Sequence, residues 1–541
     1  MRVSRSFVPT RKEPQKDART RGLEALVRAG YLRRTTKGTT VLLPLGARAL
    51  GKLEARVVGA LERSAALPIA LPDTLGVDEA EAALLDVARS ELRGYSELPR
   101  VWVQAVSREL EAPRSPFGLV GGGPERVVEA FVVAASEGDV RERLDALAES
   151  FLAVLSPTSL GAAKVLASPS GSSLAVHAHV AGLGDETTLH CRSCDARFTE
   201  DAAPKVAEPD APGAEPYHAV DTPGRSTVDD VALFLGVAPK DVLKSMVVRA
   251  RSELVLAVVR GDHAVSETRL ARALGVPTVT LATPDEVMRA TGAKVGFAGP
   301  VGFQGRVLLD PSAASDVPRV VGANAADTHL RGVRPGRDFA HEIKEIRAFG
   351  GGAPCPLCGA PLSAERAAAI ARFDVLGQGP AAREGALFAT RSGEKIPFST
   401  GRATLRVSRA LGLVAEAHSD AAGLCLPPAL APFDVHVVSL GTAPELVGAA
   451  EAIVADLESR GLDVLWDDRD DRPGPKLAMA ELVGCPVRLT LGARGLAEGV
   501  VEVVRRGALG ETFRVPLGDV GSFVDRALAG DGSAEPLEHR E

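Results

Sequence analysis

The pattern of apolar and polar positions predicts alternating helices and strands in the middle of the chain. Residues 227–236 start with a threonine and two nearby aspartates, continue with apolar residues and end at a glycine. This order is typical of a short capped helix. Residues 245–248 and 254–259 are short apolar runs that predict two strands, with a turn at residues 260–263. We therefore expect an independent α/β unit here.

Helical spacing of apolar residues also predicts helices in the first part of the chain. Residues 18–30, 47–63 and 139–155 show this spacing, and residues 73–98 form an alanine-rich stretch that is also helical in character. Strand and turn material follows at residues 164–180. In this last stretch His177 and His179 share one strand face, where we expect satisfied or exposed histidines rather than a metal site.

The last part of the chain alternates strands and helices. Residues 431–438, 464–467 and 487–491 are apolar runs that predict strands, and residues 443–460 and 476–483 predict the helices between them. A hairpin and a final helix follow. Strands that alternate with helices predict a mostly parallel sheet.

Composition narrows the class of protein. A chain of 541 residues is long enough for three or four domains. The net charge of −7 argues against indiscriminate coating of nucleic acid, although residues 1–40 carry 11 Lys/Arg against 3 Asp/Glu. That basic end could meet a phosphate backbone or be a solvated surface. No apolar run approaches the roughly 20 residues of a membrane span, so we expect a cytoplasmic protein without a membrane partner.

Four of the six cysteines form two Cys-x-x-Cys pairs, Cys191 with Cys194 and Cys355 with Cys358. Two such pairs supply the four soft ligands of a tetrahedral metal ion, and they suit a reducing compartment better than a disulfide framework does. We expect a structural Zn²⁺, with four free thiols as the alternative. If the pairs share one ion they must meet in space, which makes the block between them, from about residue 217 to 339, an inserted domain.

That block carries a resemblance to a known family. The matching segments, in order, are residues 221–223, 241–247, 261–267, 296–301, and 322–324 followed by His329. They resemble the editing insertion of bacterial prolyl-tRNA synthetases, a YbaK-like α/β domain that hydrolyses alanine misattached to proline tRNA. The resemblance implies that Lys244 is the editing lysine and that His329 lines the pocket. It also implies that Gly296, Gly299 and Pro300 lie in the loop that holds the amino acid and its ester.

The chemistry of these residues agrees with that role. Ester hydrolysis needs backbone N–H groups or a cation near the developing oxyanion, and a lysine beside a glycine-rich loop supplies both. One methylene discriminates between substrates by only about 1–3 kcal/mol, so a small side chain must be sieved by a tight pocket. The alternative is that Lys244 is a solvated cation and the loop a plain turn.

The flanking segments are similar to the class II synthetase core of the same family. Residues 47–72 resemble its first signature, which makes a dimer interface, so a homodimer is implied. Arg108 and Arg409 match the arginines that contact the ATP α- and γ-phosphates. Residues 73–98, however, lack the threonine and glutamate that hold proline.

Three further positions depart from the core pattern. Leu110 stands where the family has a glutamate. Ala403 and Leu405 replace glycines that admit adenine, so we expect their side chains to crowd a nucleotide. A glycine run at residues 121–123 lacks the Lys-Ser/Thr of a phosphate loop and is read as a flexible turn.

The C-terminal part resembles the anticodon-binding domain of these synthetases at residues 467–476 and 481–486. By this resemblance Arg469, Arg472 and Lys476 contact anticodon bases or phosphates. The alternative is an exposed charged turn.

Together these features predict a multidomain α/β and α+β protein with an antiparallel class II core, an inserted editing domain and a C-terminal α/β anticodon-binding domain. The expected division is 1–200 and 346–430 for the core, 201–345 for editing and 431–541 for anticodon binding. The predicted function is hydrolysis of mischarged aminoacyl-tRNA(Pro), such as Ala-tRNA(Pro), with tRNA(Pro) and a separate full-length synthetase as partners. The alternatives are an active proline–tRNA ligase that uses ATP and Mg²⁺, and a non-catalytic tRNA-binding module.

Overall fold

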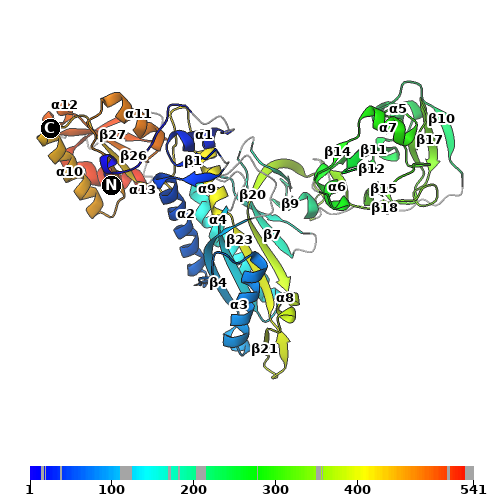
Figure 1. The fold of residues 1–541 in the computed structure, drawn as a ribbon, viewed down its shortest axis with the longest axis horizontal. Helices are drawn as coiled ribbons and strands as arrows, with labels where there is room; N and C mark the ends of the chain where they lie inside the picture. Colours follow the sequence, from blue (N-terminus) through cyan, green and yellow to red (C-terminus); the bar gives the residue numbers. More distant parts are fainter. Residues whose placement is uncertain are drawn as a thin grey trace. The chain divides into compact units, whose positions relative to one another are not determined.

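The chain forms two compact units in a computed structural model. The structure describes residues 1–13, 18, 20–36, 39–109, 125–168, 172–180, 183–202, 215–276, 278–348, 352, 355, 357–507 and 512–529. The first unit comprises residues 1–186 and 366–541, and the second comprises residues 187–365 (Figure 1). The four-part division expected from the sequence is finer than this and stays a prediction.

The first unit is built on a large sheet. Its strands are β3 (Leu67–Pro68), β4 (Arg100–Arg108), β5 (Glu125–Ala134), β6 (Ala163–Leu166), β7 (Ser173–Ala178), β20 (Ser363–Gly377) and β23 (Ser399–Leu405). They pair in the order β3-β4-β5-β23-β20-β7-β6. Every pairing except the parallel one between β3 and β4 is antiparallel, which confirms the predicted class II type of sheet.

Helices cover both faces of this sheet. On one face lie α1 (Arg21–Arg28), α2 (Pro44–Arg63), α4 (Glu137–Leu155) and α9 (Val407–Ala417), whose apolar residues form one core with the sheet (Figure 1). On the other face α3 (Val77–Glu91) packs Leu84 and Leu85 in a separate cluster with Phe131 and Phe398. The helices predicted at residues 18–30, 47–63, 73–98 and 139–155 are therefore present, the third of them shorter than expected.

Smaller elements complete the core. They are β1 (Leu32–Arg34), β2 (Thr40–Leu42), α8 (Gly379–Arg383), β21 (Leu387–Ala389) and β22 (Lys395–Pro397). The start of α1 is capped by another helix, because the Glu416 carboxylate in α9 accepts from the Gly22 N–H at 2.7 Å. A carboxylate at a helix N-terminus satisfies free N–H groups and complements the helix dipole.

The C-terminal part of the first unit has its own sheet. Its elements are β24 (Val435–Ser439), α10 (Pro444–Ser459), β25 (Val464–Asp467), α11 (Pro473–Val483), β26 (Val487–Leu491), α12 (Ala493–Ala497), β27 (Val500–Arg505), β28 (Thr512–Pro516) and α13 (Val520–Ala529). The strand order is β25-β24-β26-β27-β28. The three strands predicted from the sequence are parallel, and β27 and β28 add the predicted hairpin in antiparallel pairing.

The second unit is a separate α/β body. A mixed sheet in the order β14-β11-β12-β15-β18 and an antiparallel sheet in the order β10-β17-β16 form its frame. Its elements are β8 (Glu186–His190), β9 (Arg197–Thr199), β10 (His218–Asp221), α5 (Val228–Leu235), β11 (Leu243–Ala250), β12 (Glu253–Arg260), β13 (Ala264–Val265), α6 (Glu267–Leu274), β14 (Thr280–Leu281), α7 (Pro284–Thr291), β15 (Val307–Leu309), β16 (Arg319–Gly322), β17 (Thr328–Val333), β18 (Glu342–Ile343) and β19 (Arg347–Ala348). The helix predicted at residues 227–236 is α5, with the Thr227 side chain accepting from the Asp230 N–H and Gly236 at φ 64°.

Two helical glycines of the first unit give opposite predictions for substitution by alanine. A Cβ at Gly22 would overlap the backbone of Ala415 and Glu416, whereas a Cβ at Gly51 in α2 would meet no atom within 4 Å. We expect Gly51→Ala to stabilise the first unit by about 0.5–1 kcal/mol. Gly22→Ala should destabilise it by about 1–3 kcal/mol because α1 must move from α9. Thermal unfolding of both variants checks this, and a rise in both midpoints would contradict the packing of α1 on α9.

Candidate functional sites

A glycine-rich loop in the second unit is fixed against β16. A Cβ at Gly299 would overlap the carbonyl oxygen of Gly322, so only glycine allows this approach. The Asn324 side chain joins the two segments: its Oδ1 accepts from the Gly299 N–H at 2.8 Å, and its Nδ2 donates to the carbonyl oxygens of Gly299 at 3.0 Å and Val301 at 2.9 Å. The backbone of the loop at residues 296–300 is therefore held in one conformation.

The first glycine of the loop is constrained as well. Gly296 has φ 99°, which favours glycine, and a Cβ there would lie 2.5 Å from the Ser226 Cβ. Ser226 stands directly before the N-cap of α5. The loop is thus held between the start of α5 on one side and β16 on the other.

His329 lies beside this loop. It is 4% exposed in β17, its Nδ1 lies 2.7 Å from the Thr222 Oγ1, and its ring centroid lies 5.6 Å from that of Phe297. Burial lowers the pKa of His329, so the ring is neutral near pH 7. The neutral imidazole of His329 and the ring of Phe297 together form a weakly polar surface beside the loop.

Lys244 lies near the start of β11, at the same level as the loop. A parallel bridge joins Val242 to Val320, so Lys244 and Gly322 both lie two residues further along neighbouring segments. Lys244 is half-buried and forms no ion pair with any residue that the structure describes. Its charge is therefore available to a ligand. The structure brings Gly296, Gly299, Pro300 and His329 together, and it places the backbone of Lys244 on the segment that is bridged to the one carrying Gly322.

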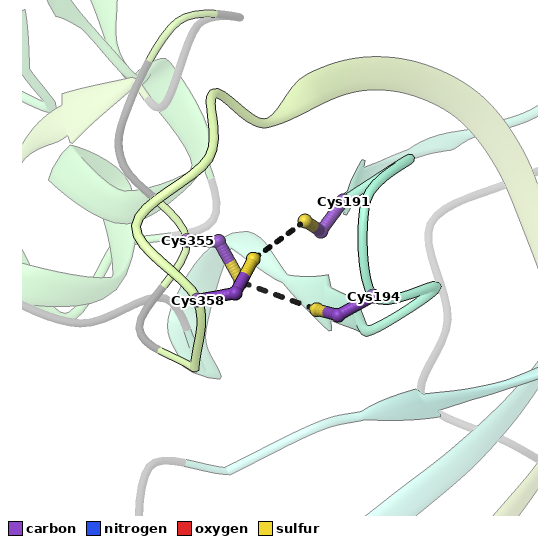
Figure 2. A group of neighbouring side chains, drawn as sticks. All are labelled: Cys191, Cys194, Cys355 and Cys358. Carbon is purple, nitrogen blue, oxygen red and sulfur yellow. Dashed lines mark hydrogen bonds between the residues drawn. The ribbon is translucent and has the colours of Figure 1, made fainter.

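The four paired cysteines of the second unit converge (Figure 2). The Sγ atoms of Cys191 and Cys358 are 3.4 Å apart, those of Cys194 and Cys355 are 3.7 Å apart, and all four lie within 4.8 Å of one another. Four sulfurs bound to one tetrahedral metal at about 2.3 Å would be about 3.8 Å apart. The separations are too long for disulfide bonds of about 2.05 Å.

Backbone geometry shapes both cysteine pairs. The N–H groups of Cys191 and Cys355 donate to the carbonyl oxygens of Ala196 and Ala360, which closes two tight knuckles. Hydrogen bonds to the Cys191 sulfur, the largest contribution coming from the Cys194 N–H, together lower the pKa of Cys191 to about 6, which favours the thiolate that a metal binds. The cysteine cluster therefore fits a metal ion. It is the one such group found among the described His, Cys, Asp and Glu residues, whereas His177 bonds to Glu186 at 2.8 Å.

In the first unit, both arginines expected to bind ATP are engaged in ion pairs. Arg108 is 3% exposed; its Nε and Nη2 donate to the Glu129 carboxylate at 2.9 and 2.8 Å, and its Nη1 donates to the Leu75 carbonyl oxygen at 2.7 Å. Arg409 is also buried, and its Nη2 lies 2.5 Å from each carboxylate oxygen of Asp185. Neither guanidinium faces open space.

The face of the sheet next to Arg108 is closed by α3. A cavity of about 20 Å³ remains between α3 and strands β4, β5 and β23, which is room for one or two water molecules. Its lining consists of Ile69, Val77, Ala80, Glu81, Leu84, Trp102, Gln104, Glu129, Ala130, Phe131 and Arg402. The Arg402 Nη1 reaches the Glu81 carboxylate on α3 at 3.4 Å. Among the described residues, this cavity is much smaller than a nucleotide.

The prediction that the Ala403 and Leu405 side chains crowd a nucleotide is wrong, because these side chains do not face the cavity. Both side chains belong to the core with the helices on the opposite face. Side chains alternate along a strand, so Arg402, not its neighbours, faces the cavity. Crowding comes from α3 instead. Leu110 and residues 121–123 lie outside the described residues.

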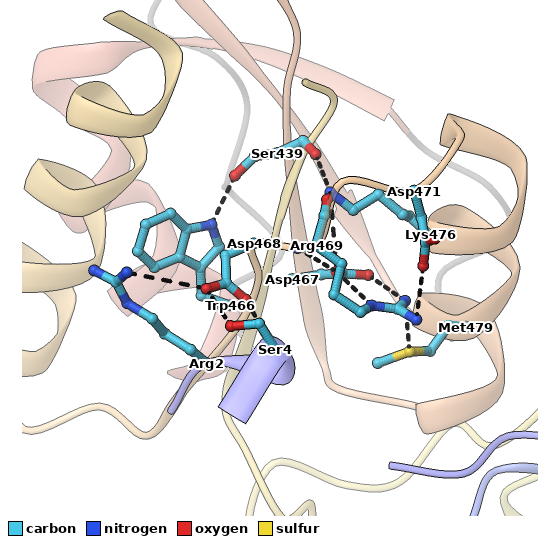
Figure 3. Close-up of polar contacts among 10 residues, drawn as sticks. All are labelled: Arg2, Ser4, Ser439, Trp466, Asp467, Asp468, Arg469, Asp471, Lys476 and Met479. Carbon is cyan, nitrogen blue, oxygen red and sulfur yellow. Dashed lines mark hydrogen bonds and ion pairs between the residues drawn. The ribbon is translucent and has the colours of Figure 1, made fainter. Parts of the chain in front are cut away.

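The segment after β25 holds the residues expected to contact tRNA. Arg469 is 31% exposed, and its Nε and Nη2 donate to the buried Asp467 carboxylate at 2.9 and 2.8 Å (Figure 3). Arg472 is exposed at the N-cap of α11 and has no ion pair among the residues that the structure describes. These two arginines can reach a ligand in solution.

Lys476 is different, and the prediction of a direct contact needs correction. Its side chain is 0% exposed, and Nζ donates to the carbonyl oxygens of Ser439 at 2.6 Å and Arg469 at 2.5 Å. Burial lowers the pKa of Lys476. Both hydrogen bonds would have to break before Nζ could reach an anticodon. The buried lysine therefore stabilises the backbone of the segment after β25.

Comparisons with known proteins agree with this geometry. Residues 222–339 match the aminoacyl-tRNA editing domain family, and residues 434–526 match the anticodon binding domain family. A proline--tRNA ligase of Nitratidesulfovibrio vulgaris is 33% identical over 96% of this chain and 96% of its own length. One of Pelotomaculum thermopropionicum is 30% identical over 98% of this chain and 100% of its own. The chain belongs to the bacterial-type prolyl-tRNA synthetase family.

A solved structure supports the fold of this synthetase family member. The prolyl-tRNA synthetase of Cryptosporidium parvum, complexed with L-proline and AMP, covers 94% of this chain and 75% of its own at a TM-score of 0.51 and 13% identity. This likeness confirms the predicted fold class, and the relatives above confirm the predicted family. No helix in the described part of the synthetase-like chain has both the length and the apolar character of a membrane crossing.

Sequence reasoning missed several residues of these sites. The role of Asn324 in holding the loop has a sequence signal, because asparagine tolerates the αL conformation that it adopts two residues after Gly322. Thr222, the partner of His329, has no such signal. The sequence around Asp185 and Glu129 does not indicate that these residues pair with Arg409 and Arg108.

The cysteine cluster gives a prediction on metal content. We expect the purified protein to contain one divalent metal ion per chain, and Cys358→Ser to lose most of it because a hydroxyl is a much weaker soft-metal ligand than a thiolate. Cys425→Ser is the matched control, since the Cys425 Sγ bonds to Asp420 outside the cluster. Elemental analysis of the three proteins checks this. Equal metal content in Cys358→Ser and Cys425→Ser would rule out the site.

Proposed function

We propose that this protein hydrolyses mischarged aminoacyl-tRNA(Pro), such as Ala-tRNA(Pro), through its editing domain, and that it does not activate proline. The observation that carries the proposal is the contrast between two places in the chain. The glycine loop in the second unit is fixed by close backbone contacts and has Lys244 on a neighbouring segment, whereas α3 packs on the face of the sheet that carries Arg108.

The editing chemistry follows from the residues at the loop. Water attacks the ester carbonyl carbon, the bond to the ribose oxygen of the tRNA breaks, and that oxygen leaves with a proton. The negative charge that develops on the carbonyl oxygen needs a positive partner. Lys244 provides one at the level of Gly322, and the loop is already fixed by Asn324, so little reorganisation is needed.

Selection of a small amino acid also fits this loop. Gly296 and Gly299 allow the backbone to come close to Ser226 and Gly322, which narrows the space on either side. One methylene changes the binding free energy of a substrate by only about 1–3 kcal/mol, so exclusion of a larger side chain requires a rigid pocket surface. The buried pair of Phe297 and His329 supplies such a surface.

Loss of proline activation is supported by the first unit. A cavity of about 20 Å³ cannot take ATP and an amino acid. Use of Arg108 for a phosphate would also require its two hydrogen bonds to Glu129 to be given up.

The rival function is proline–tRNA ligation, which the names of the relatives favour. It would need ATP and Mg²⁺, and α3 would have to leave the sheet when they bind. A third candidate is a tRNA-binding module without catalysis.

The remaining parts fit a tRNA-processing enzyme. We propose that the four cysteines hold a structural Zn²⁺, since four thiolates leave no open position for a substrate. Arg469 and Arg472 are proposed to contact tRNA(Pro). A homodimer, a separate full-length synthetase as partner and a cytoplasmic location stay predictions of the sequence.

The proposed hydrolysis depends on the charge of Lys244. We expect Lys244→Ala to slow deacylation of Ala-tRNA(Pro) by about 10²–10³-fold, the usual effect of removing one oxyanion partner. The measurement is the loss of radiolabelled alanine from pre-charged tRNA(Pro) under single-turnover conditions.

Lys344→Ala is the matched control for this assay. Lys344 is an exposed lysine of the same unit and follows β18. Its substitution should leave the rate within about twofold, because an exposed charge far from the reaction contributes little. A wild-type protein that binds tRNA but leaves the ester intact would favour the non-catalytic module. Equal rates for wild type and Lys244→Ala would remove the lysine from the mechanism.

A further inference from the structure

The N-terminal residues lie along the edge of the C-terminal sheet, next to the segment that carries Arg469. The backbone of Arg2 forms a parallel bridge with Trp466 in β25, and the backbone N–H of Trp466 donates to the Met1 carbonyl oxygen at 2.8 Å. The start of the chain therefore extends this sheet beyond its edge strand β25. The same strand ends at Asp467, where the segment that carries Arg469 and Arg472 begins.

Two side chains strengthen this contact (Figure 3). Ser4 binds both carboxylate oxygens of Asp468, through its N–H at 2.9 Å and its Oγ at 2.7 Å. The Arg2 guanidinium lies 4.4 Å from the Trp466 ring centroid and pairs with Glu451 at 2.6 Å. A cation over an indole ring and a doubly bonded carboxylate are both directional contacts.

The segment is consequently fixed at consecutive residues from different sides. Asp467 is buried and binds the Arg469 guanidinium, Asp468 is held by Ser4, and the Arg469 carbonyl oxygen is held by Lys476. The Arg469 guanidinium is partly exposed while it pairs with Asp467 and Asp471, and the exposed Arg472 side chain has no ion pair among the described residues. Recognition groups work best when neighbouring groups fix them before the ligand arrives.

We propose that Arg2 and Ser4 are positioning residues for anticodon recognition: they do not touch tRNA but fix the direction in which Arg469 and Arg472 are presented. This rests on the proposed contact of those two arginines with tRNA(Pro). With alanine at both positions, Asp468 loses the hydrogen bond from the Ser4 Oγ and its ion pair with Arg2, and Trp466 loses the guanidinium over its ring, whereas the backbone contacts of the N-terminus to β25 are kept. The segment can therefore shift while the domain stays folded.

The test compares binding of two tRNAs by the full-length protein. One is a tRNA(Pro) transcript, and the other differs from it in one anticodon base. The ratio of their dissociation constants reports how well the anticodon is read. We expect Arg2→Ala/Ser4→Ala to weaken binding of the tRNA(Pro) transcript by about tenfold and to move the ratio towards one. Ser4→Thr, which keeps the hydroxyl, should retain the ratio.

Arg48→Ala is the matched control. Arg48 also contacts the C-terminal part of the unit, since its Nε donates to the Pro432 carbonyl oxygen at 2.6 Å and its guanidinium lies 4.6 Å from the Phe433 ring centroid. Neither of these contacts involves residues 467–472. We expect this variant to lower the unfolding midpoint without changing the ratio of dissociation constants.

The outcomes separate this inference from the proposed function. An unchanged ratio in Arg2→Ala/Ser4→Ala, with or without a lower unfolding midpoint, would overturn the positioning role, because a merely structural contact affects both tRNAs equally. Arg469→Ala tests the anticodon contact by itself. If that variant also leaves the ratio unchanged, the proposed contact fails and the basis of this inference fails with it.

Discussion

The packing of α3 against strands β4, β5 and β23 is the contact on which the account of the first unit depends. Leu84 and Leu85 on one side and Phe131 and Phe398 on the other form an apolar cluster of their own. At its border Arg402 pairs with Glu81, and burial raises the pKa of this carboxyl group. Removing α3 would expose the apolar cluster to water and break this pair. The closed state is therefore a property of the folded chain rather than of one side chain.

The second unit shows the opposite arrangement. There, close backbone contacts at Gly299 and Gly322 and the carboxamide of Asn324 fix a loop, while the nearby Lys244 keeps its charge unpaired by any described residue. Stabilisation of an oxyanion requires donors or a positive charge that are fixed before the reaction. The two parts of the chain therefore differ in packing and charge: the helix α3 closes one face of the sheet in the first unit, whereas the loop in the second unit is fixed by its own backbone contacts.

Local patterns predicted the elements well and the long-range contacts poorly. The cap at Thr227, the glycine at Gly236 and the Cys-x-x-Cys spacing are written into neighbouring residues, so helix α5 and the cysteine cluster could be expected. The partner of Arg409 is Asp185, far away along the chain, and only the register of the folded sheet brings them together. The face on which Ala403 points and the burial of Lys476 depend on tertiary packing in the same way. No alternation rule applied to one strand can say which of its faces meets solvent.

Proline-dependent exchange of radiolabelled pyrophosphate into ATP tests the closed core most directly, because the exchange requires ATP, Mg²⁺ and proline to bind together at that place. With α3 seated on the sheet, the full-length protein should show no exchange above a reaction without proline, under conditions in which it still binds tRNA(Pro). Exchange at the pace of an ordinary proline–tRNA ligase would contradict this account, since it would show that the core opens and works.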